Sequence, residues 1–190
     1  AGRFSLDSLD VVIDLQFTRA QADDVTVSFL RPVPTRAALE VARMPGVLYA
    51  EPQRVEGVRL RVGPRMREAA ILGLPADATL RHVYDAHGRR WAMPREGILL
   101  SRALATRLGV AVGEPVTVED LDGSRAPQDV PVAAVVDDLM GLMGYMDLAA
   151  LHRLRGDGGR VTAVALRVDP LQRDALFDRL KRAPAVAATS

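Results

Sequence analysis

The side chains that carry out most protein chemistry are scattered along this sequence and form no recognised motif. Ser101 lacks the G-x-S-x-G turn that exposes a nucleophilic serine, and its place before a helical pattern is typical of a helix cap. His82, His87 and His152 do not have the spacing of metal ligands. The chain has no cysteine, which excludes disulfides, thiolate metal sites and cysteine nucleophiles. We therefore expect no catalytic residue, no metal ion and no cofactor.

Two groups of carboxylates are candidates for metal binding or acid–base chemistry. The run 120–123 (DLDG) is similar to the start of a calcium loop, but its twelfth position is Pro131, where a calcium loop needs a bidentate glutamate. A hairpin turn is the better interpretation of this run. Asp137 and Asp138 form an adjacent pair. We interpret them as the polar end of a strand before a loop.

The most distinctive segment is the methionine-rich run 139–146, LMGLMGYM. Flexible thioethers suit adaptable apolar contacts. One interpretation is buried structure that leads into a helix capped by Asp147. The other is an exposed loop that touches a partner, a lipid or a second copy of the protein. Under the second interpretation the candidate contacts with a partner or substrate are Met140, Leu142, Met143, Tyr145 and Met146.

Composition narrows the class of protein. Of the 190 residues, 48% are hydrophobic, which is enough for a packed core, and the net charge is only +1. Aromatic residues make up 4%, so we do not expect the basic, aromatic-lined surface of a nucleic-acid-binding protein. No apolar run approaches the roughly 20 residues that span a bilayer. Because the chain starts without Met and stops inside an apolar segment, we expect further segments at both ends.

The first part of the chain predicts a helix followed by a strand–helix–strand unit. Apolar residues spaced three, four and four apart indicate an amphipathic helix over 6–17. Residues 24–31 are rich in β-branched and apolar side chains, which favours a strand. We expect Thr35 to cap a helix that runs to Met44, and a second strand to begin at 47–50.

The last part of the chain repeats the strand–helix–strand order. Residues 161–167 predict a strand, and Leu171, Leu176 and Leu180 form the apolar stripe of the helix that follows. Extended structure resumes at 185–187. Two such units in one sheet form a split βαβ, ferredoxin-like layer, so we expect an α+β fold with the middle of the chain inserted between its halves.

The sequence pattern in the middle of the chain predicts a mostly β region. We expect strands at 58–62, 68–74, 116–118 and 130–136, and short helices at 102–108 and 148–154. This predicts a first lobe made of 1–56 and 157–190, and an inserted lobe made of 57–156.

The stretch 96–118, EGILLSRALATRLGVAVGEPVTV, resembles a segment of the extracytoplasmic domains of MacB/FtsX-type ABC transporter permeases. In that family a strand, a serine-capped helix, an LGV and a VG(D/E) turn follow one another in this order. The N-terminal run 6–29 is similar to the family's junction between the first transmembrane helix and the first strand. The run 135–151 is similar to the family's approach to the helix near the end of the insertion.

The resemblance implies a fold and a function. The split βαβ lobe would be porter-like and the inserted, mostly β lobe sabre-like. Such a domain lies outside the cytoplasm, periplasmic in Gram-negative bacteria, between the first two transmembrane helices of a cell-membrane permease. Its partners are those transmembrane helices, a second permease protomer, a separate ATP-binding subunit, and a periplasmic or lipid partner. It couples cytoplasmic ATP hydrolysis to substrate handling or mechanical transmission outside the membrane. No phosphate-binding GxxxxGK[ST] loop occurs in this chain.

Two other functions stay open from the residues alone. A stand-alone α+β module that binds a ligand or a protein, such as an adaptor domain, would use the same architecture. A small hydrolase would need a convergent polar pocket, for which the sequence offers no residues.

Overall fold

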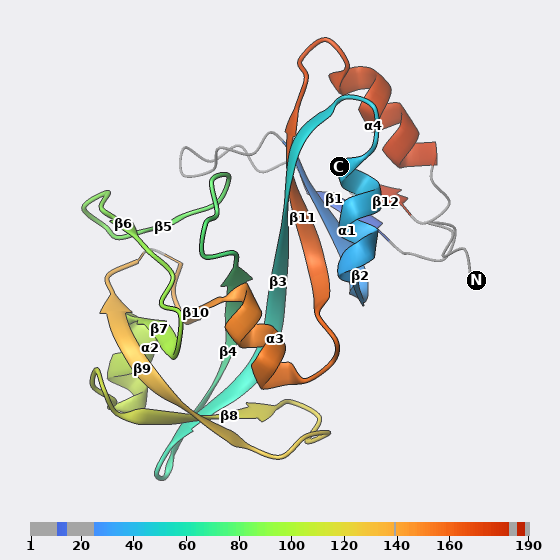
Figure 1. Ribbon diagram of the computed structural model, residues 1–190. Helices are drawn as coiled ribbons and strands as arrows, with labels where there is room; N and C mark the ends of the chain where they lie inside the picture. The colour runs from blue at the N-terminus through green and yellow to red at the C-terminus, as the bar shows by residue number, and fades with distance from the viewer. Residues whose placement is uncertain (1–10, 15–24, 139, 183–185, 189–190) are drawn as a thin grey trace. The chain divides into compact units, whose positions relative to one another are not determined.

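The structure, a computed structural model, describes residues 11–14, 25–138, 140–182 and 186–188 (Figure 1). The chain divides into two compact units. The first unit consists of Ala1–Gln53, Ala78–Arg81 and Gly158–Ser190, and the second of Arg54–Asp77 and His82–Asp157. The sequence analysis placed 78–81 in the inserted lobe, whereas the contacts of this short segment are with the first unit. The reason is Glu51, whose buried carboxylate accepts hydrogen bonds from the backbone of Thr79 and Leu80.

The first unit is built on a mixed sheet. Its strand order is β12, β1, β2, β11, β3, in which β1 and β12 are parallel and the other neighbours are antiparallel. The strands are β1 (Val11–Asp14), β2 (Val25–Pro34), β11 (Arg160–Val168), β12 (Val186–Ala188) and the first part of β3 (Val47–Val62). The predicted pairing of the two end segments in one sheet is confirmed, because β2 pairs directly with β11.

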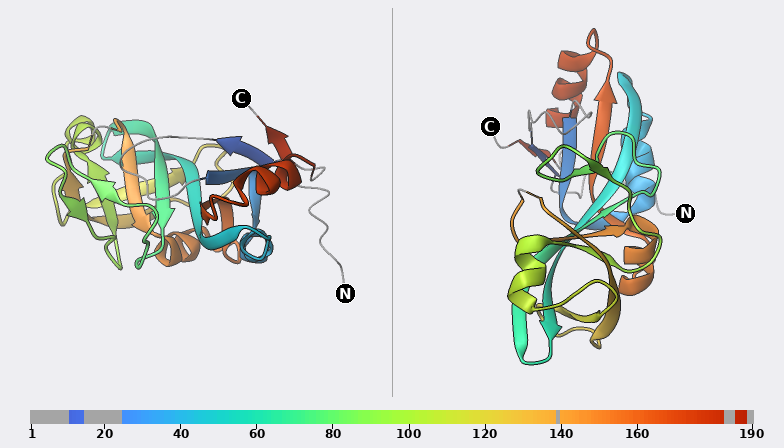
Figure 2. Two further views of the ribbon diagram at one scale, coloured as in Figure 1. Left: turned by 90° about the horizontal axis from the view of Figure 1, so that it is seen from above. Right: turned by 90° about the vertical axis from the view of Figure 1, so that its left-hand side faces the viewer.

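Two helices, α1 (Thr35–Ala42) and α4 (Arg173–Arg182), share the apolar core of this sheet. Val41 of α1 and Leu176 and Leu180 of α4 lie in one buried cluster with the alternate residues of β2 and β11. Figure 2 shows both helices from two further directions. Both helices therefore pack on the shared sheet, as a split βαβ layer requires.

Three local predictions for the first unit are wrong. The predicted helix over 6–17 is a strand at 11–14, because β-branched Val and Ile residues there pair with β2; its other residues lie outside the described part of the chain. Thr35 is not the cap of α1: Pro34 precedes the helix, and the Thr35 hydroxyl donates to the carbonyl of Gly159 at 2.5 Å. Leu171 is 96% exposed, because Asp169 accepts its N–H in a turn and α4 begins only at Arg173.

The second unit is a closed barrel of six strands. The order is β3, β4, β10, β7, β9, β8, and β8 pairs back onto β3, so that the described strands leave no open edge. These strands are the second part of β3, β4 (Arg65–Leu74), β7 (Ile98–Ser101), β8 (Pro115–Asp120), β9 (Gln128–Val136) and β10 (Met143–Asp147). Leu60, Ile71 and Leu100 are fully buried in its core. The mostly β character predicted for this region is confirmed.

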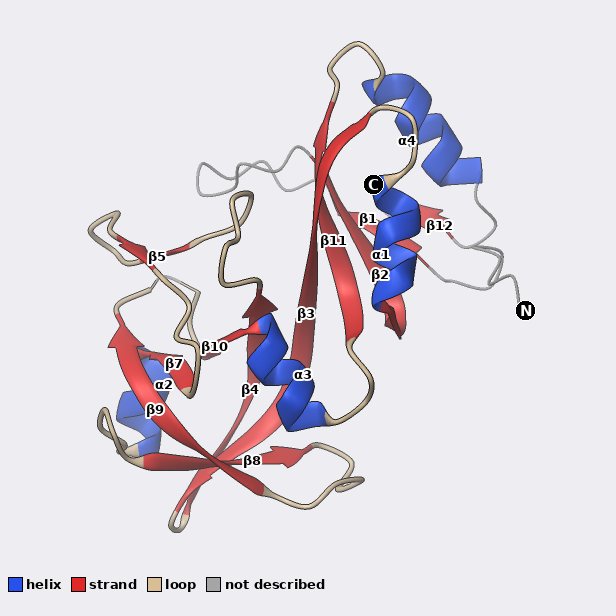
Figure 3. Cartoon of the chain, viewed as in Figure 1, coloured by secondary structure: helices blue, strands red, loops and turns tan. Residues whose placement is uncertain are grey.

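Two helices pack on the barrel core, α2 (Arg102–Leu108) and α3 (Leu148–Arg155), close to their predicted positions. Leu104 and Leu151 anchor them, each fully buried. A separate two-stranded hairpin consists of β5 (Val83–Tyr84) and β6 (Arg90–Trp91). Figure 3 shows it as two short strands in the long loop between β4 and β7. The whole chain is thus an α+β protein, as predicted.

The sequence did not predict the continuity of β3. Separate strands were expected at 47–50 and 58–62, but β3 is one strand of 16 residues that pairs with β11 in the first unit and with β4 and β8 in the second. The chain enters the second unit at Arg54 within this strand and finally leaves it at Asp157. The assignment of the two units as porter-like and sabre-like lobes stays a prediction.

Candidate functional site

The structure divides the methionine-rich run into an exposed and a buried part. Met140 is 71% exposed, and Leu142 and Met143 are half-buried. Tyr145 and Met146 are only 3% and 2% exposed, and both belong to β10, a strand of the barrel wall that pairs with β4 and β7 on its two sides. The prediction of a surface contact is therefore wrong for Tyr145 and Met146. It stays a prediction for Met140, Leu142 and Met143.

Close packing around Gly144 explains why β10 is a core strand. A Cβ atom at this position would lie 2.8 Å from Cδ1 of Ile98, which is closer than real side-chain contacts allow. The Ile98 side chain therefore packs directly against the backbone of β10 at Gly144. The adjacent Tyr145, whose side chain points to the opposite face of the strand, is also buried, and its hydroxyl donates a hydrogen bond to the Asp138 carboxylate.

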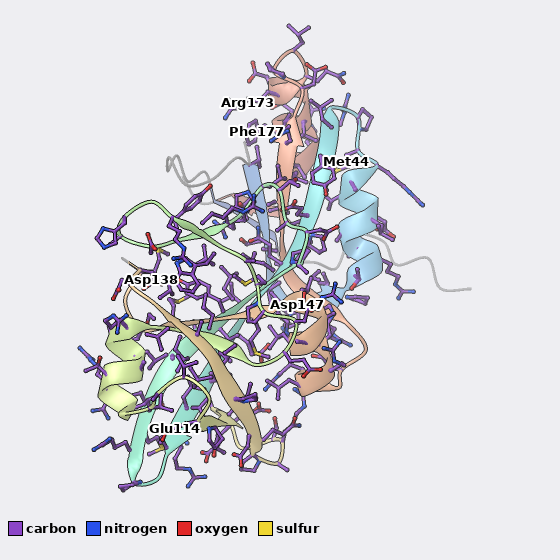
Figure 4. The ribbon with its side chains drawn as sticks, turned by 60° about the vertical axis from the view of Figure 1, so that its left-hand side comes forward. Met44, Glu114, Asp138, Asp147, Arg173 and Phe177 are labelled. Carbon is purple, nitrogen blue, oxygen red and sulfur yellow. The ribbon has the colours of Figure 1, made fainter. Side chains whose placement is uncertain are left out.

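Asp138 lies just beyond the end of β9, as the predicted strand end required (Figure 4). Burial raises the pKa of its carboxyl and outweighs the hydrogen bond from Tyr145, which lowers it. Burial together with the hydrogen bond to Asp138 raises the pKa of the Tyr145 phenol. One oxygen of Asp138, Oδ1, is buried and has no hydrogen-bond partner among the described residues. The neighbouring Asp137 instead points outward and forms an ion pair with Arg102.

The β5–β6 hairpin concentrates aromatic and basic side chains, of which the sequence analysis named only His82 and His87. Residues 82–91 hold the only tryptophan of the chain, two of its three histidines and two adjacent arginines. The one acid of this stretch, Asp85, accepts hydrogen bonds from the N–H groups of His87 and Arg89, both at 2.9 Å, and from Trp91 Nε1 at 3.1 Å. These bonds, led by that from Arg89, lower the pKa of Asp85.

A cation–π contact also stabilises this hairpin. The guanidinium of Arg89 lies 4.7 Å from the centre of the Trp91 ring, and Tyr84 pairs across the hairpin with Arg90. Arg89 and Arg90 are exposed, whereas Trp91 and Tyr84 are half-buried. The result is a preorganised turn that presents both aromatic rings and positive charge.

A backbone hydrogen bond ties the hairpin to the loop that carries Met140. The N–H of Ala86 donates to the carbonyl of Asp137 at 2.6 Å, and Met140 follows three residues later. We call the combined feature the hairpin–loop surface, and it consists of Tyr84, Arg89, Arg90, Trp91 and Met140. Only the clustering of tryptophan, tyrosine and arginine in 82–91 could have indicated it from the sequence.

A buried network of ion pairs crosses the second unit. Arg54, only 2% exposed, binds both oxygens of Asp157 at 2.9 and 2.6 Å and Glu56 at 2.7 Å. Arg155 continues the network to Glu56 at 2.8 Å and to Asp120. Burial alone would lower the pKa of Arg54, but its hydrogen bonds to Asp157 and Glu56 raise it. The network thus joins the residues at which the chain enters and finally leaves this unit.

The remaining sequence candidates have structural roles. Ser101 caps α2 by accepting the N–H of Leu104 at 3.3 Å, and it also accepts the N–H of Met143 at 3.2 Å. Asp147 caps α3 through the N–H of Ala150 at 3.2 Å. Both predicted caps are confirmed.

The candidate calcium run is a strand end and a turn. Asp120 is buried and forms an ion pair with Arg155, and its pKa is lowered because hydrogen bonds from Arg155 and Ser124 outweigh the opposing effect of burial. Gly123 adopts φ +67 in the turn that follows, as the hairpin interpretation requires. Among the described residues no group of three or more histidines and carboxylates has the arrangement of a metal site.

A shallow hollow of about 540 Å³ lies along α2. Its two charged side chains are both engaged: Arg102 pairs with Asp137, and Glu114 accepts the N–H of Ala111 at 2.8 Å. The rest of its lining is mostly apolar or backbone.

Comparison with known proteins finds a likeness in structure only. No protein-family model and no curated protein matches the sequence. The extracellular domain of the noncanonic ABC-type transporter YknZ from Gram-positive bacteria is 14% identical, with a TM-score of 0.54 over 76% of this chain and 78% of that one. The periplasmic region of MacB from Actinobacillus actinomycetemcomitans is 13% identical, with a TM-score of 0.49 over 78% and 73%. The chain therefore shares the fold of the YknZ extracellular domain, and the predicted resemblance is confirmed for the fold. None of the helices in the described ranges is long and apolar enough to cross a bilayer.

Proposed function

We propose that this chain is the extracytoplasmic domain of an ABC transporter permease and that it couples ATP hydrolysis in the cytoplasm to work outside the membrane. The observation that carries the proposal is the fold shared with the YknZ extracellular domain over about three quarters of both chains. On this proposal the first unit is the porter-like lobe and the barrel the sabre-like lobe. The transmembrane helices of the same permease, a second protomer and a separate ATP-binding subunit are its partners.

The construction of the second unit supports a mechanical role. A closed barrel has no free strand edge at which it can open, so it resists deformation. The chain enters this unit at Arg54 and finally leaves it at Asp157, and a bidentate ion pair joins these two residues. Force transmitted through these two chain segments therefore acts on the barrel where the ion pair joins them, next to the short excursion of 78–81 into the first unit.

The location is tested by single-cysteine labelling in the complete protein. Because this chain has no cysteine, Arg125→Cys in the exposed β8–β9 loop introduces one unique thiol into it. A membrane-impermeant maleimide should label this thiol in intact cells, after an outer membrane, where one exists, has been made permeable. Labelling that requires lysis of the cytoplasmic membrane would overturn the proposal and favour a stand-alone binding module.

Two controls sharpen the labelling result. The complete protein without the substitution measures labelling of thiols elsewhere. Leu151→Cys places a thiol in the fully buried core of the same unit and should react only after denaturation. Reaction of both variants in intact cells would mean an unfolded domain.

A further inference from the structure

The hairpin–loop surface is held in one arrangement by contacts within the hairpin. An isolated two-stranded hairpin is marginal in water, and Asp85 stabilises this one with three hydrogen bonds. Its carboxylate accepts hydrogen bonds from N–H groups of the hairpin itself. The hairpin stretch 82–91 contains two arginines and one aspartate, which leaves a net charge of +1. The surface is thus rigid, positively charged and rich in aromatic rings.

These side chains match the headgroup region of a lipid bilayer. Tryptophan and tyrosine are amphipathic and concentrate at the boundary between water and hydrocarbon. Arginine forms paired hydrogen bonds with phosphate oxygens. Met140, 71% exposed in the loop that the hairpin binds, adds a flexible apolar side chain.

We propose that the hairpin–loop surface binds the headgroups of anionic phospholipids. Arg89 and Arg90 contact the phosphates, while Trp91 and Met140 enter the boundary between headgroups and acyl chains. This inference rests on contacts within the second unit and not on the proposed transport function. Cysteine labelling tests the compartment, and lipid binding tests this surface, so either proposal can fail without the other.

Trp91 provides a direct probe, because it is the only tryptophan in the chain. The purified chain is mixed with vesicles of equal parts phosphatidylglycerol and phosphatidylcholine, and Trp91 emission and co-sedimentation are measured. We expect a blue shift and sedimentation with these vesicles, and neither with pure phosphatidylcholine. Inorganic phosphate at the same phosphate concentration should leave the emission unchanged, which separates a bilayer surface from free phosphate.

The double variant Arg89→Gln/Arg90→Gln should weaken vesicle binding about 25-fold, since each arginine near an anionic surface contributes about a factor of five. The matched control Arg67→Gln/Arg107→Gln removes two exposed arginines from the same unit and should bind within about twofold of the parent chain, because neither arginine belongs to the hairpin–loop surface. Circular dichroism checks that both variants are folded.

Four outcomes overturn the proposal. The first is absence of binding to the anionic vesicles. The second is an equal loss of vesicle binding in the two double variants, which would mean that binding depends only on the net charge of the chain. The third is binding without a change in Trp91 emission, which would place the lipid elsewhere. The fourth is a shift of Trp91 emission by a short single-stranded oligonucleotide at concentrations where the vesicles cause none. That result would mean that the surface binds a nucleic acid and not a lipid.

Discussion

Replacing Arg54 with methionine should destabilise the second unit more than the loss of any exposed ion pair on its surface. The substitution removes the partner of both Asp157 oxygens and one partner of Glu56, while these carboxylates stay only 12% and 15% exposed. Removing one side of a buried ion pair typically costs about 3–5 kcal/mol, because the remaining charge is left without compensation. Arg54→Lys keeps the charge but cannot form the bidentate contact, so its cost should be about 1.5–3 kcal/mol, the range for hydrogen bonds to charged groups.

Arg59 offers a matched control on the same strand. Its ion pair with Glu68 is 3.3 Å long, and the two side chains are 32% and 69% exposed. Exposed pairs contribute about 0–1 kcal/mol, so Arg59→Met should change stability little. The two variants differ mainly in burial and geometry, since each removes one arginine from β3.

Urea unfolding followed by Trp91 emission measures these effects, because the tryptophan lies in the same unit as both arginines. We expect the order of stability to be parent chain, Arg59→Met, Arg54→Lys, Arg54→Met. A loss below about 1 kcal/mol for Arg54→Met would refute the reasoning, because it would mean that the network contributes no more than an exposed pair. Equal losses for the two methionine variants would refute it as well.

Other changes test the caps, the methionine-rich run and the buried carboxyl. Ser101→Ala should lower the free energy of unfolding in urea by about 1–3 kcal/mol, because two N–H groups lose their acceptor. This loss should be larger than that of Asp147→Ala, in which only one N–H group loses its acceptor. The reverse order would contradict the double role of Ser101. Met140→Ser should leave the thermal midpoint nearly unchanged, because its side chain is exposed. Tyr145→Ser should lower the free energy of unfolding by at least about 3 kcal/mol, because its side chain is buried. Small shifts of the thermal midpoint for both variants would show that β10 is not a core strand. Because burial raises the pKa of Asp138, its contribution to folding is present below its unfolded pKa and is lost as the pH rises through the higher folded pKa. Asp138→Asn should therefore stabilise the chain at neutral pH and have little effect near about pH 3, as urea midpoints across this range would reveal.

Local chemistry accounts for the parts of the fold that the sequence predicted correctly. The positions of α2 and α3 follow from Ser101 and Asp147, which cap these helices through the N–H group three residues later. The turn at Gly123 follows in the same way from the conformational freedom of glycine. Such signals depend on residues a few positions apart, so one sequence is enough to detect them.

Local signals failed where pairing with a distant segment competed with helix spacing. The apolar spacing over 6–17 suits a helix, but at 11–14 the pairing of β1 with β2 and β12 produces a strand. Thr35 has the chemistry of a cap, but Gly159, 124 positions away, takes its hydroxyl. In each case a contact remote in sequence outweighed a local preference.

The sequence by itself therefore determined the α+β class, the two matching end segments and the mostly β middle, because hydrophobic period and turn chemistry are local properties. Only the tertiary structure decided which half of the methionine-rich run is surface, since the pairing of β10 with β4 and β7 buries Tyr145 and leaves Met140 outside. It also brought Arg54 to Asp157 across 103 positions and the hairpin to Asp137. These contacts join segments far apart in the chain, so no local pattern in the sequence could have indicated them.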